Sequence, residues 1–190
     1  MKFCSDCGAP VTRLIPDMDN KLRDVCTSCH TIHYQNPKIV AGTLPVFGNK
    51  VLLCKRAIEP RLGYWTLPAG FMENKETTPQ AAIRETQEEA NASVELSHLL
   101  SMIDVPHISQ VHMFFYAELT DLNFSSGEES LEVKLFSEDE IPWEEIAFPT
   151  VKKTLKHYLS ERKIKNHYKN YELLMETIEF SERIQASTAS

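Results

Sequence analysis

Three glutamates near the end of one expected helix strongly limit what this chain can fold into. The stretch GFMENKETTPQAAIRETQEEANA, residues 70–92, is expected to be helical in its second half, with Glu85, Glu88 and Glu89 near the helix C-terminus. Their i, i+3 and i+4 spacing puts them on one face. The negative end of the helix dipole opposes each carboxylate there by about 0.3–1 kcal/mol. Such a helix is stable only if something neutralises this face.

Local signals define where this helix begins and ends. Thr77 and Gln80 have the spacing of a capping box, and Pro79 falls in the first turn, where proline is tolerated. Asn91 lies where a residue in the left-handed conformation would end the helix.

The sequence around the helix alternates in the manner of strands, which predicts an α+β fold. Apolar runs flank the dipeptide Gly48–Asn49, a hairpin signal, and Cys54 in the second run is expected to be a buried strand thiol. A short helix is expected near the SEDEI sequence. The remaining expected elements are strands at 93–104, 110–119 and 131–136 and a helix at 150–162.

Four cysteines form two C-x2-C pairs in residues 1–34, a segment too short to build a core of its own. Four thiolates at this spacing suit a tetrahedral structural zinc ion, so a zinc ribbon is predicted. The alternatives are haem attachment at the CTSCH sequence or two disulfides, which require export or an oxidising compartment. The predicted zinc ligands are Cys4, Cys7, Cys26 and Cys29.

Composition narrows the class of protein. The chain is 42% hydrophobic and 25% charged, as in globular proteins, and its net charge of −7 argues against a duplex-binding protein. The N-terminal residues lack the apolar segment of a signal peptide, and no run is long enough to span a membrane. A cytoplasmic protein without membrane contacts is expected.

The spacing of charged residues in 70–92 resembles the signature of the Nudix hydrolases, G-x5-E-x7-R-E-U-x-E-E-x-G-U, where U is aliphatic. The chain departs from it at Thr86, Asn91 and Ala92, although Thr and Ala can pack there and Asn tolerates the left-handed conformation. Every charged position matches. The matching residues are Gly70, Glu76, Arg84, Glu85, Glu88 and Glu89.

The resemblance implies a Nudix-type mixed sheet with a catalytic helix and a role for each matching residue. Glu85 and Glu89 would bind Mg²⁺ or Mn²⁺, with Glu88 as a direct or water-mediated ligand and the Ala69 carbonyl completing the set. Such hard cations prefer oxygen ligands. Arg84 and Glu76 would pair to hold the loop at Gly70 against the helix. The general base is left open between Glu88 and Glu129, and an exposed acidic turn explains Glu129 equally well.

The substrate class follows from the same resemblance. With a four-cysteine ribbon in front, the chain is similar to NADH, FAD and ADP-ribose diphosphatases. The S-Q-P-W-P-F-P-x-S array of the NADH enzymes is reduced here to Ser109 and Gln110, which favours FAD or ADP-ribose. Arg56 is a candidate phosphate contact, or else a solvated strand-end charge. Trp65 and Phe71 are candidate stacking surfaces, although aromatic residues more often pack in cores.

The resemblance covers residues 37–160, which leaves 161–190 as a helical extension with a frayed tail. A homodimer is expected, as is common among such enzymes. Residues 151–170 hold seven Lys or Arg and one Glu, which indicates a solvated helix face or a patch for an anionic substrate or RNA. The remaining alternatives are NADH or RNA-cap hydrolysis, and a non-catalytic RNA-binding protein on the same scaffold.

Overall fold

The computed structural model describes residues 1–164 and 171–178. Contacts divide the chain into two compact units, Met1–Pro37 and the remainder from Lys38. The smaller unit is an antiparallel three-stranded sheet in the order β1 (Val11–Leu14), β2 (Arg23–Cys26) and β3 (Ile32–His33). Its buried apolar side chains are those of Cys4, Pro16, Val25 and Cys26, so this unit has only a small apolar interior.

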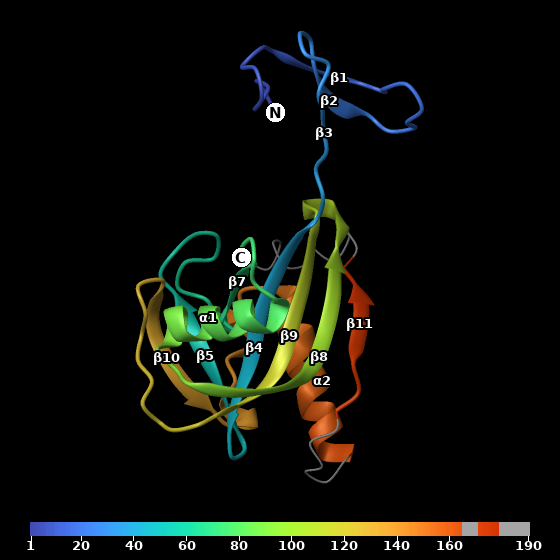
Figure 1. The fold of residues 1–190 in the computed structure, drawn as a ribbon. Helices are drawn as coiled ribbons and strands as arrows, with labels where there is room; N and C mark the ends of the chain where they lie inside the picture. The colour runs from blue at the N-terminus through green and yellow to red at the C-terminus, as the bar shows by residue number, and fades with distance from the viewer. Residues whose placement is uncertain (165–170, 179–190) are drawn as a thin grey trace. The chain divides into compact units, whose positions relative to one another are not determined.

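The larger unit is built on a mixed sheet, as predicted, with the strand order β10-β5-β4-β9-β8-β11 (Figure 1). β4 and β9 pair in parallel, as do β8 and β11, whereas β10–β5, β4–β5 and β8–β9 are antiparallel. Two short strands, β6 and β7, pair with β5 and β4. The strand bounds are β4 (Lys38–Phe47), β5 (Lys50–Arg56), β6 (Trp65–Thr66), β7 (Ala69–Phe71), β8 (Val94–Val105), β9 (Gln110–Leu119), β10 (Ser130–Phe136) and β11 (Leu174–Thr177).

One helix covers each face of this sheet: α1 (Thr78–Ala90) lies on one face and α2 (Pro149–Ile164) on the other (Figure 1). Side chains therefore alternate between two apolar layers along each central strand. In β9, Phe114 joins the core beneath α2, and Phe115 packs with Ala81 and Ala82 of α1. The two phenylalanines therefore point to opposite faces of the sheet, and both fill the core.

Helix α1 begins and ends where its local signals predicted. Thr77 is the N-cap, and its capping box with Gln80 is complete on both sides. Asn91 ends the helix with φ of 46°, in the left-handed region. The turn at Gly48–Asn49 and the buried Cys54 in β5 also agree with the sequence-based expectations.

The C-terminal part differs from expectation. The short helix expected near the SEDEI sequence is present as the 3₁₀ helix η2 (Glu138–Glu140), whereas η1 (Pro106–Ile108) and η3 (Trp143–Glu145) were not expected. The expected helical extension over 161–190 holds up to Ile164, the end of α2, and is wrong at Leu174–Thr177, which form β11 instead. The tail expected to fray falls outside the described residues. Among the helices described, none has the length and apolar character needed to cross a membrane.

Candidate active site

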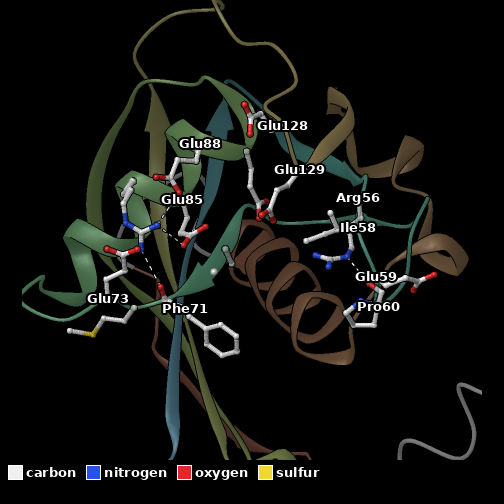
Figure 2. A pocket seen from close by; sticks show the side chains of 15 residues that line it. Arg56, Ile58, Glu59, Pro60, Phe71, Glu73, Glu85, Glu88, Glu128 and Glu129 are labelled. Carbon is white, nitrogen blue, oxygen red and sulfur yellow. Dashed lines mark hydrogen bonds and ion pairs between the residues drawn. The ribbon is translucent and has the colours of Figure 1, made fainter.

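A cleft of about 810 Å³ opens beside α1, between β7 and the connection that precedes β10. It brings together nearly all the residues predicted from the 70–92 stretch with others distant in sequence (Figure 2). Its walls are formed by Arg56, Ile58, Glu59, Pro60, Ala69, Gly70, Phe71, Met72, Glu73, Arg84, Glu85, Glu88, Glu89, Glu128 and Glu129.

The three glutamates of α1 differ in their exposure to solvent. Glu89 is only 7% exposed, and burial, reinforced by the charge of Glu85, raises its pKa to about 8. Burial also raises the pKa of Glu85, although Arg84 acts in the opposite direction. The side chain of Glu88 is 58% exposed at the mouth of the cleft. Burial makes such a carboxylate costly to ionise, and a bound cation offsets that cost because it stabilises the charged form.

Arg84 connects these carboxylates to the neighbouring loop. Its Nη1 donates to Glu85 Oε1 at 2.7 Å and to Glu88 Oε2 at 3.0 Å. Its Nη2 donates to Glu76 Oε1 at 2.8 Å and to the Phe71 carbonyl at 3.1 Å. The expected Arg84–Glu76 pair is therefore present, and a single guanidinium ties the loop after β7 to the acidic face.

The loop at Gly70 lies directly against the acidic face. A Cβ at Gly70 would overlap the Glu85 carboxylate, so a larger residue there would displace Glu85. Ala69 lines the same cleft, and its backbone interacts with the Glu89 carboxylate. Ala69 is thus placed beside the glutamates with which it was expected to bind a cation.

The donor atoms in this cleft suit a hard divalent cation. Carboxylate oxygens from Glu85, Glu88 and Glu89 and the backbone of Ala69 line one cavity, and Mg²⁺ and Mn²⁺ prefer such ligands. Arg84 supplies one positive charge against several carboxylates there, so the cleft retains an excess of negative charge.

Two further acidic residues reach the cleft from the connection between β9 and β10. Glu128 and Glu129 precede β10, and in Figure 2 Glu129 lies between the α1 glutamates and Arg56. The Ala57 amide donates to the Glu129 carbonyl at 2.8 Å, which ties this segment to the end of β5. The charge of Glu129 contributes to the raised pKa of both Glu85 and Glu89.

Arg56 and Phe71 both line the cleft as candidate substrate contacts. Arg56 Nε donates to the Pro60 carbonyl at 2.8 Å, and its Cζ lies 5.1 Å from the centre of the Phe148 ring, which fixes the side chain's direction. Phe71 is 49% exposed, and Lys38 Nζ lies 4.9 Å from its ring centre. Phe71 thus presents an aromatic surface to the cleft.

Trp65 lies elsewhere, and the expectation that it could stack on a substrate is corrected. Its side chain is 5% exposed and belongs to the core beneath α2. It meets the Phe136 ring edge-to-face with centroids 4.8 Å apart. Pairing of β6 with β5 turns this tryptophan inward, whereas Phe71, five residues after the end of β6, faces the cleft.

Several lining residues were not singled out from the sequence. Ile58, Glu59 and Pro60 follow β5 and enter the cleft through the loop to β6, whose conformation the sequence pattern does not define. Glu128 had a signal, because it precedes the candidate Glu129 in the same acidic turn.

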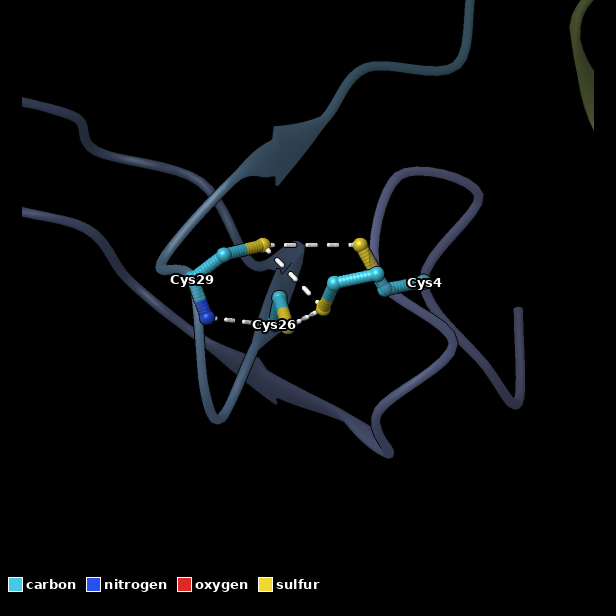
Figure 3. Close-up of side chains that lie close together, drawn as sticks. Cys4, Cys26 and Cys29 are labelled. Carbon is cyan, nitrogen blue, oxygen red and sulfur yellow. Dashed lines mark hydrogen bonds between the residues drawn. The ribbon is translucent and has the colours of Figure 1, made fainter.

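The four cysteines of the N-terminal unit form a separate cluster (Figure 3). Their Sγ atoms all lie within 4.8 Å of one another, with distances of 3.6 Å for Cys4–Cys29 and 3.4 Å for Cys7–Cys26. A tetrahedral zinc ion with Zn–S bonds of about 2.3 Å requires sulfur atoms about 3.8 Å apart. The amides of Asp6 and Ser28 each donate to a cysteine Sγ at 3.4 Å, an arrangement that stabilises thiolates. The cluster therefore fits a zinc ion.

The described part of the basic segment 151–170 is largely ion-paired. Lys153 Nζ lies 2.7 Å from Glu176 Oε2, and Lys163 and Arg162 both contact Glu138. These pairs favour a solvated helix face over an RNA-binding patch for residues up to 164. Residues 165–170 lie outside the described part of the chain.

Comparisons with known proteins identify relatives of both units. Residues 36–158 match the family model described as NUDIX domain, and residues 2–35 match the one described as Nudix N-terminal. The crystal structure of a NUDIX hydrolase from Nitrosomonas europaea is 54% identical, with a TM-score of 0.87, and the match covers 94% of this chain and 100% of that one.

Two curated relatives carry more specific names. The ADP-ribose pyrophosphatase of Methanocaldococcus jannaschii is 27% identical over 132 residues, which are 66% of this chain and 75% of the relative. The NAD-capped RNA hydrolase NudC of Salmonella heidelberg is 28% identical over 148 residues, which are 74% of this chain and 53% of the relative. The chain thus matches about half the length of that second relative.

Proposed function

The chain belongs to the NUDIX hydrolases, and from this membership we propose its activity. The proposed reaction is divalent-metal-dependent hydrolysis of the diphosphate in an ADP-linked compound, with ADP-ribose or FAD as the favoured substrates. The products are AMP and a second phosphate ester. The observation that carries the proposal is the convergence of three α1 glutamates, an arginine and an exposed aromatic ring in one cleft.

The residues of the cleft divide the work of this reaction. When bound, Mg²⁺ or Mn²⁺ neutralises diphosphate charge and lowers the pKa of a coordinated water. Glu85, Glu88 and Glu89, with Ala69, provide the oxygen ligands, and Arg84 keeps Glu85 and Glu88 on one side of the cleft. Arg56 can bind a phosphate oxygen across from them.

Glu129 is our preferred general base. A base must reach the attacking water without being consumed as a metal ligand or an ion-pair partner. Glu88 already accepts from Arg84 and belongs to the proposed ligand set, whereas Glu129 enters the cleft from a different element.

Two observations support ADP-ribose or FAD as the substrate class. Phe71 offers an exposed ring at the cleft on which a flat base or flavin can stack, worth about 1–3 kcal/mol for one stacked base. A relative that aligns over 75% of its own length is named an ADP-ribose pyrophosphatase. Trp65 no longer contributes to this argument, because it is buried.

A substrate panel tests the proposal directly. We expect kcat/KM for ADP-ribose or FAD to exceed the values for NADH, NAD and diadenosine polyphosphates, measured with Mg²⁺ and then with Mn²⁺. A tenfold or greater preference for NADH, about 1.4 kcal/mol of transition-state discrimination, would refute the substrate class and leave the diphosphatase activity standing.

Replacing a ligand tests the metal assignment. Glu85→Gln keeps the shape of the side chain but removes its charge, so kcat should fall about 10²–10³-fold through the loss of several kcal/mol of charge stabilisation. Glu95→Gln, the same change at an exposed position of β8, is the matched control. Near-normal turnover by Glu85→Gln on every diphosphate tried would contradict the assignment.

NAD-capped RNA is the second candidate substrate, because several curated relatives are named NudC. Gln110 is one of the two residues retained from the NADH-type array. Its Oε1 lies 2.8 Å from His112 Nε2, and its side chain does not line the cleft. This contact favours the ADP-ribose class. If the protein hydrolysed the cap of NAD-capped RNA faster than it hydrolysed ADP-ribose, the order of the two candidates would be reversed.

A further inference from the structure

We propose that Asn91 is a positioning residue that fastens the acidic loop, residues 124–129, to the end of α1 and thereby sets the place of Glu129 in the cleft. This inference rests on the proposed function, because it concerns the residue that we assign as the general base. Asn91 stands where the family signature has a glycine, so the contact comes from a side chain that the signature itself lacks.

The amide of Asn91 faces three acceptors in the acidic loop. Its Nδ2 lies 3.2 Å from the Ser126 carbonyl, 3.2 Å from Ser125 Oγ and 3.4 Å from the Ser125 carbonyl. A side-chain amide has two N–H donors, so two or three of these contacts can be satisfied together.

The backbone of the same loop caps the carbonyls at the end of α1. The Ser125 amide donates to the Ala90 carbonyl at 2.9 Å, and the Gly127 amide donates to the Glu89 carbonyl at 3.0 Å. A Cβ at Gly127 would overlap the Glu88 carbonyl, so the loop approaches as closely as its backbone allows. Free carbonyls at a helix end require such donors.

These contacts act on the metal-binding face and on Glu129 together. Glu88 and Glu89, whose carbonyls meet Gly127, carry two of the proposed ligands, and Glu129 follows Gly127 by two residues. On its other side Glu129 is held by the Ala57 amide. Hydrogen bonds therefore hold the segment around Glu129 on both sides, from the Ala57 amide after β5 and from the Asn91 side chain at the end of α1.

Backbone conformation alone does not explain an asparagine at this position. Asn91 has φ of 46°, where glycine is at least as favourable, and glycine is the commonest residue at such helix ends. Asn91→Gly therefore keeps the helix end and removes only the side-chain contacts with Ser125 and Ser126, which makes it a selective test.

Hydrogen exchange of the metal-free protein tests the anchor without any activity. In Asn91→Gly we expect the amides of Ser125 and Gly127 to exchange at least about tenfold faster, while the amides of the main sheet keep their protection. The matched control is Asn123→Gly, which puts a glycine at an exposed position just before the same loop and keeps the backbone amide that donates to Asp121 Oδ1 at 2.7 Å. Unchanged exchange at Ser125 and Gly127 would overturn the proposal.

Kinetics test whether the anchor acts through Glu129. Asn91→Gly should lower kcat about ten- to a hundredfold with little change in KM, since small displacements of a catalytic group have effects of this size. In a Glu129→Gln background the same change should add little further loss, because the group that it positions is already disabled.

Equal fold-losses in both backgrounds, or an unchanged kcat in Asn91→Gly, would also overturn the proposal. A wild-type protein inactive on the whole panel would instead refute the proposed function. In that case the exchange measurement alone decides whether Asn91 anchors the loop.

Discussion

At the residue scale, one departure from the signature places a hydroxyl group in the core, where it has two hydrogen-bond partners. Thr86, which replaces an aliphatic residue of the signature, is fully buried yet donates to the Ala82 carbonyl at 2.7 Å and pairs with Thr43 at 2.6 Å between hydroxyl oxygens. This pairing removes the penalty for a buried hydroxyl. The departure from the signature is thus accommodated within the core under α1.

His112 of β9 provides a pH-dependent prediction. Its Nδ1 lies 3.0 Å from Thr150 Oγ1 and its Nε2 2.8 Å from Gln110 Oε1, and burial lowers its pKa to about 4 from the usual 6.5. Between these values the unfolded chain binds a proton that the folded protein does not. Stability should therefore fall as the pH drops from about 6.5 to about 4, by up to about 3 kcal/mol, with no contribution from His112 above that range.

Denaturant unfolding at pH 7.5 and pH 4.5 measures this effect. His112→Gln should lose less stability between the two pH values than the wild type, even if it is less stable at both. His30→Gln, at an exposed position of the N-terminal unit, is the control. An identical pH dependence in wild type and His112→Gln would contradict the prediction.

Sequence spacing predicted the charged site residues better than the aromatic ones. The positions of Glu85, Glu88 and Glu89 follow from helical periodicity, which is local. The direction of Trp65 depends on the pairing of a two-residue strand with β5, which no local pattern encodes. For the same reason the loop residues 58–60 were not foreseen.

At the element scale, the C-terminal segment shows how a non-local contact overrides a local pattern. Leu174, Met175 and Ile178 have spacing compatible with a helix, yet Leu174–Thr177 pair in parallel with Ser101–Asp104 of β8. Pairing at the sheet edge gives this segment backbone hydrogen bonds to β8 in place of those that it would form within a helix. Only knowledge of the free edge at β8 could have predicted this strand.

Tyr171 fastens this strand to the domain. Its ring lies 5.1 Å from Tyr116 and 5.4 Å from Tyr158 between centroids, both residues being buried. Aromatic pairs of this kind contribute about 0.5–1.5 kcal/mol each. We expect Tyr171→Ala to lower the free energy of unfolding by about 1–3 kcal/mol. The hydrogen-exchange rates of the β11 amides should also increase in this variant.

Tyr171→Phe is the matched variant, since it keeps the ring, and it should retain most of the protection of β11. Exchange spectra of the two variants, with the amides of β4 and β9 as internal references, check the prediction. Full protection of β11 in Tyr171→Ala would show that strand pairing alone holds this segment.

At the scale of the whole molecule, two units carry two different metal chemistries. The N-terminal unit offers four sulfur donors and the larger unit a set of oxygen donors, so the first selects a soft or borderline cation and the second a hard one. With four thiolates, the first site has no open position for a water, which assigns it a structural role. We therefore assign the proposed hydrolysis to the cleft of the larger unit.

The dependence of each unit on metal should therefore differ. Few apolar side chains are buried in residues 1–37, so we expect zinc binding to provide most of the folding free energy there, whereas the larger unit has an apolar core on each face of its sheet. A thiol-reactive reagent with a zinc chelator should release about one zinc per chain and abolish the exchange protection of β1–β3. The amides of β4, β9 and α1 should remain protected.

Substitutions distinguish this outcome from general unfolding. Cys26→Ser should purify with less than the full zinc content and with β1–β3 unprotected, because three thiolates bind zinc more weakly than four. Cys54→Ala removes the one cysteine outside the cluster, buried in β5, and should keep its zinc. Loss of zinc from Cys54→Ala, or retention of protected β1–β3 strands after complete zinc release, would contradict the assignment. Protection retained without zinc would mean that the three-stranded sheet is stable through its own backbone pairing, which its few buried apolar residues do not support.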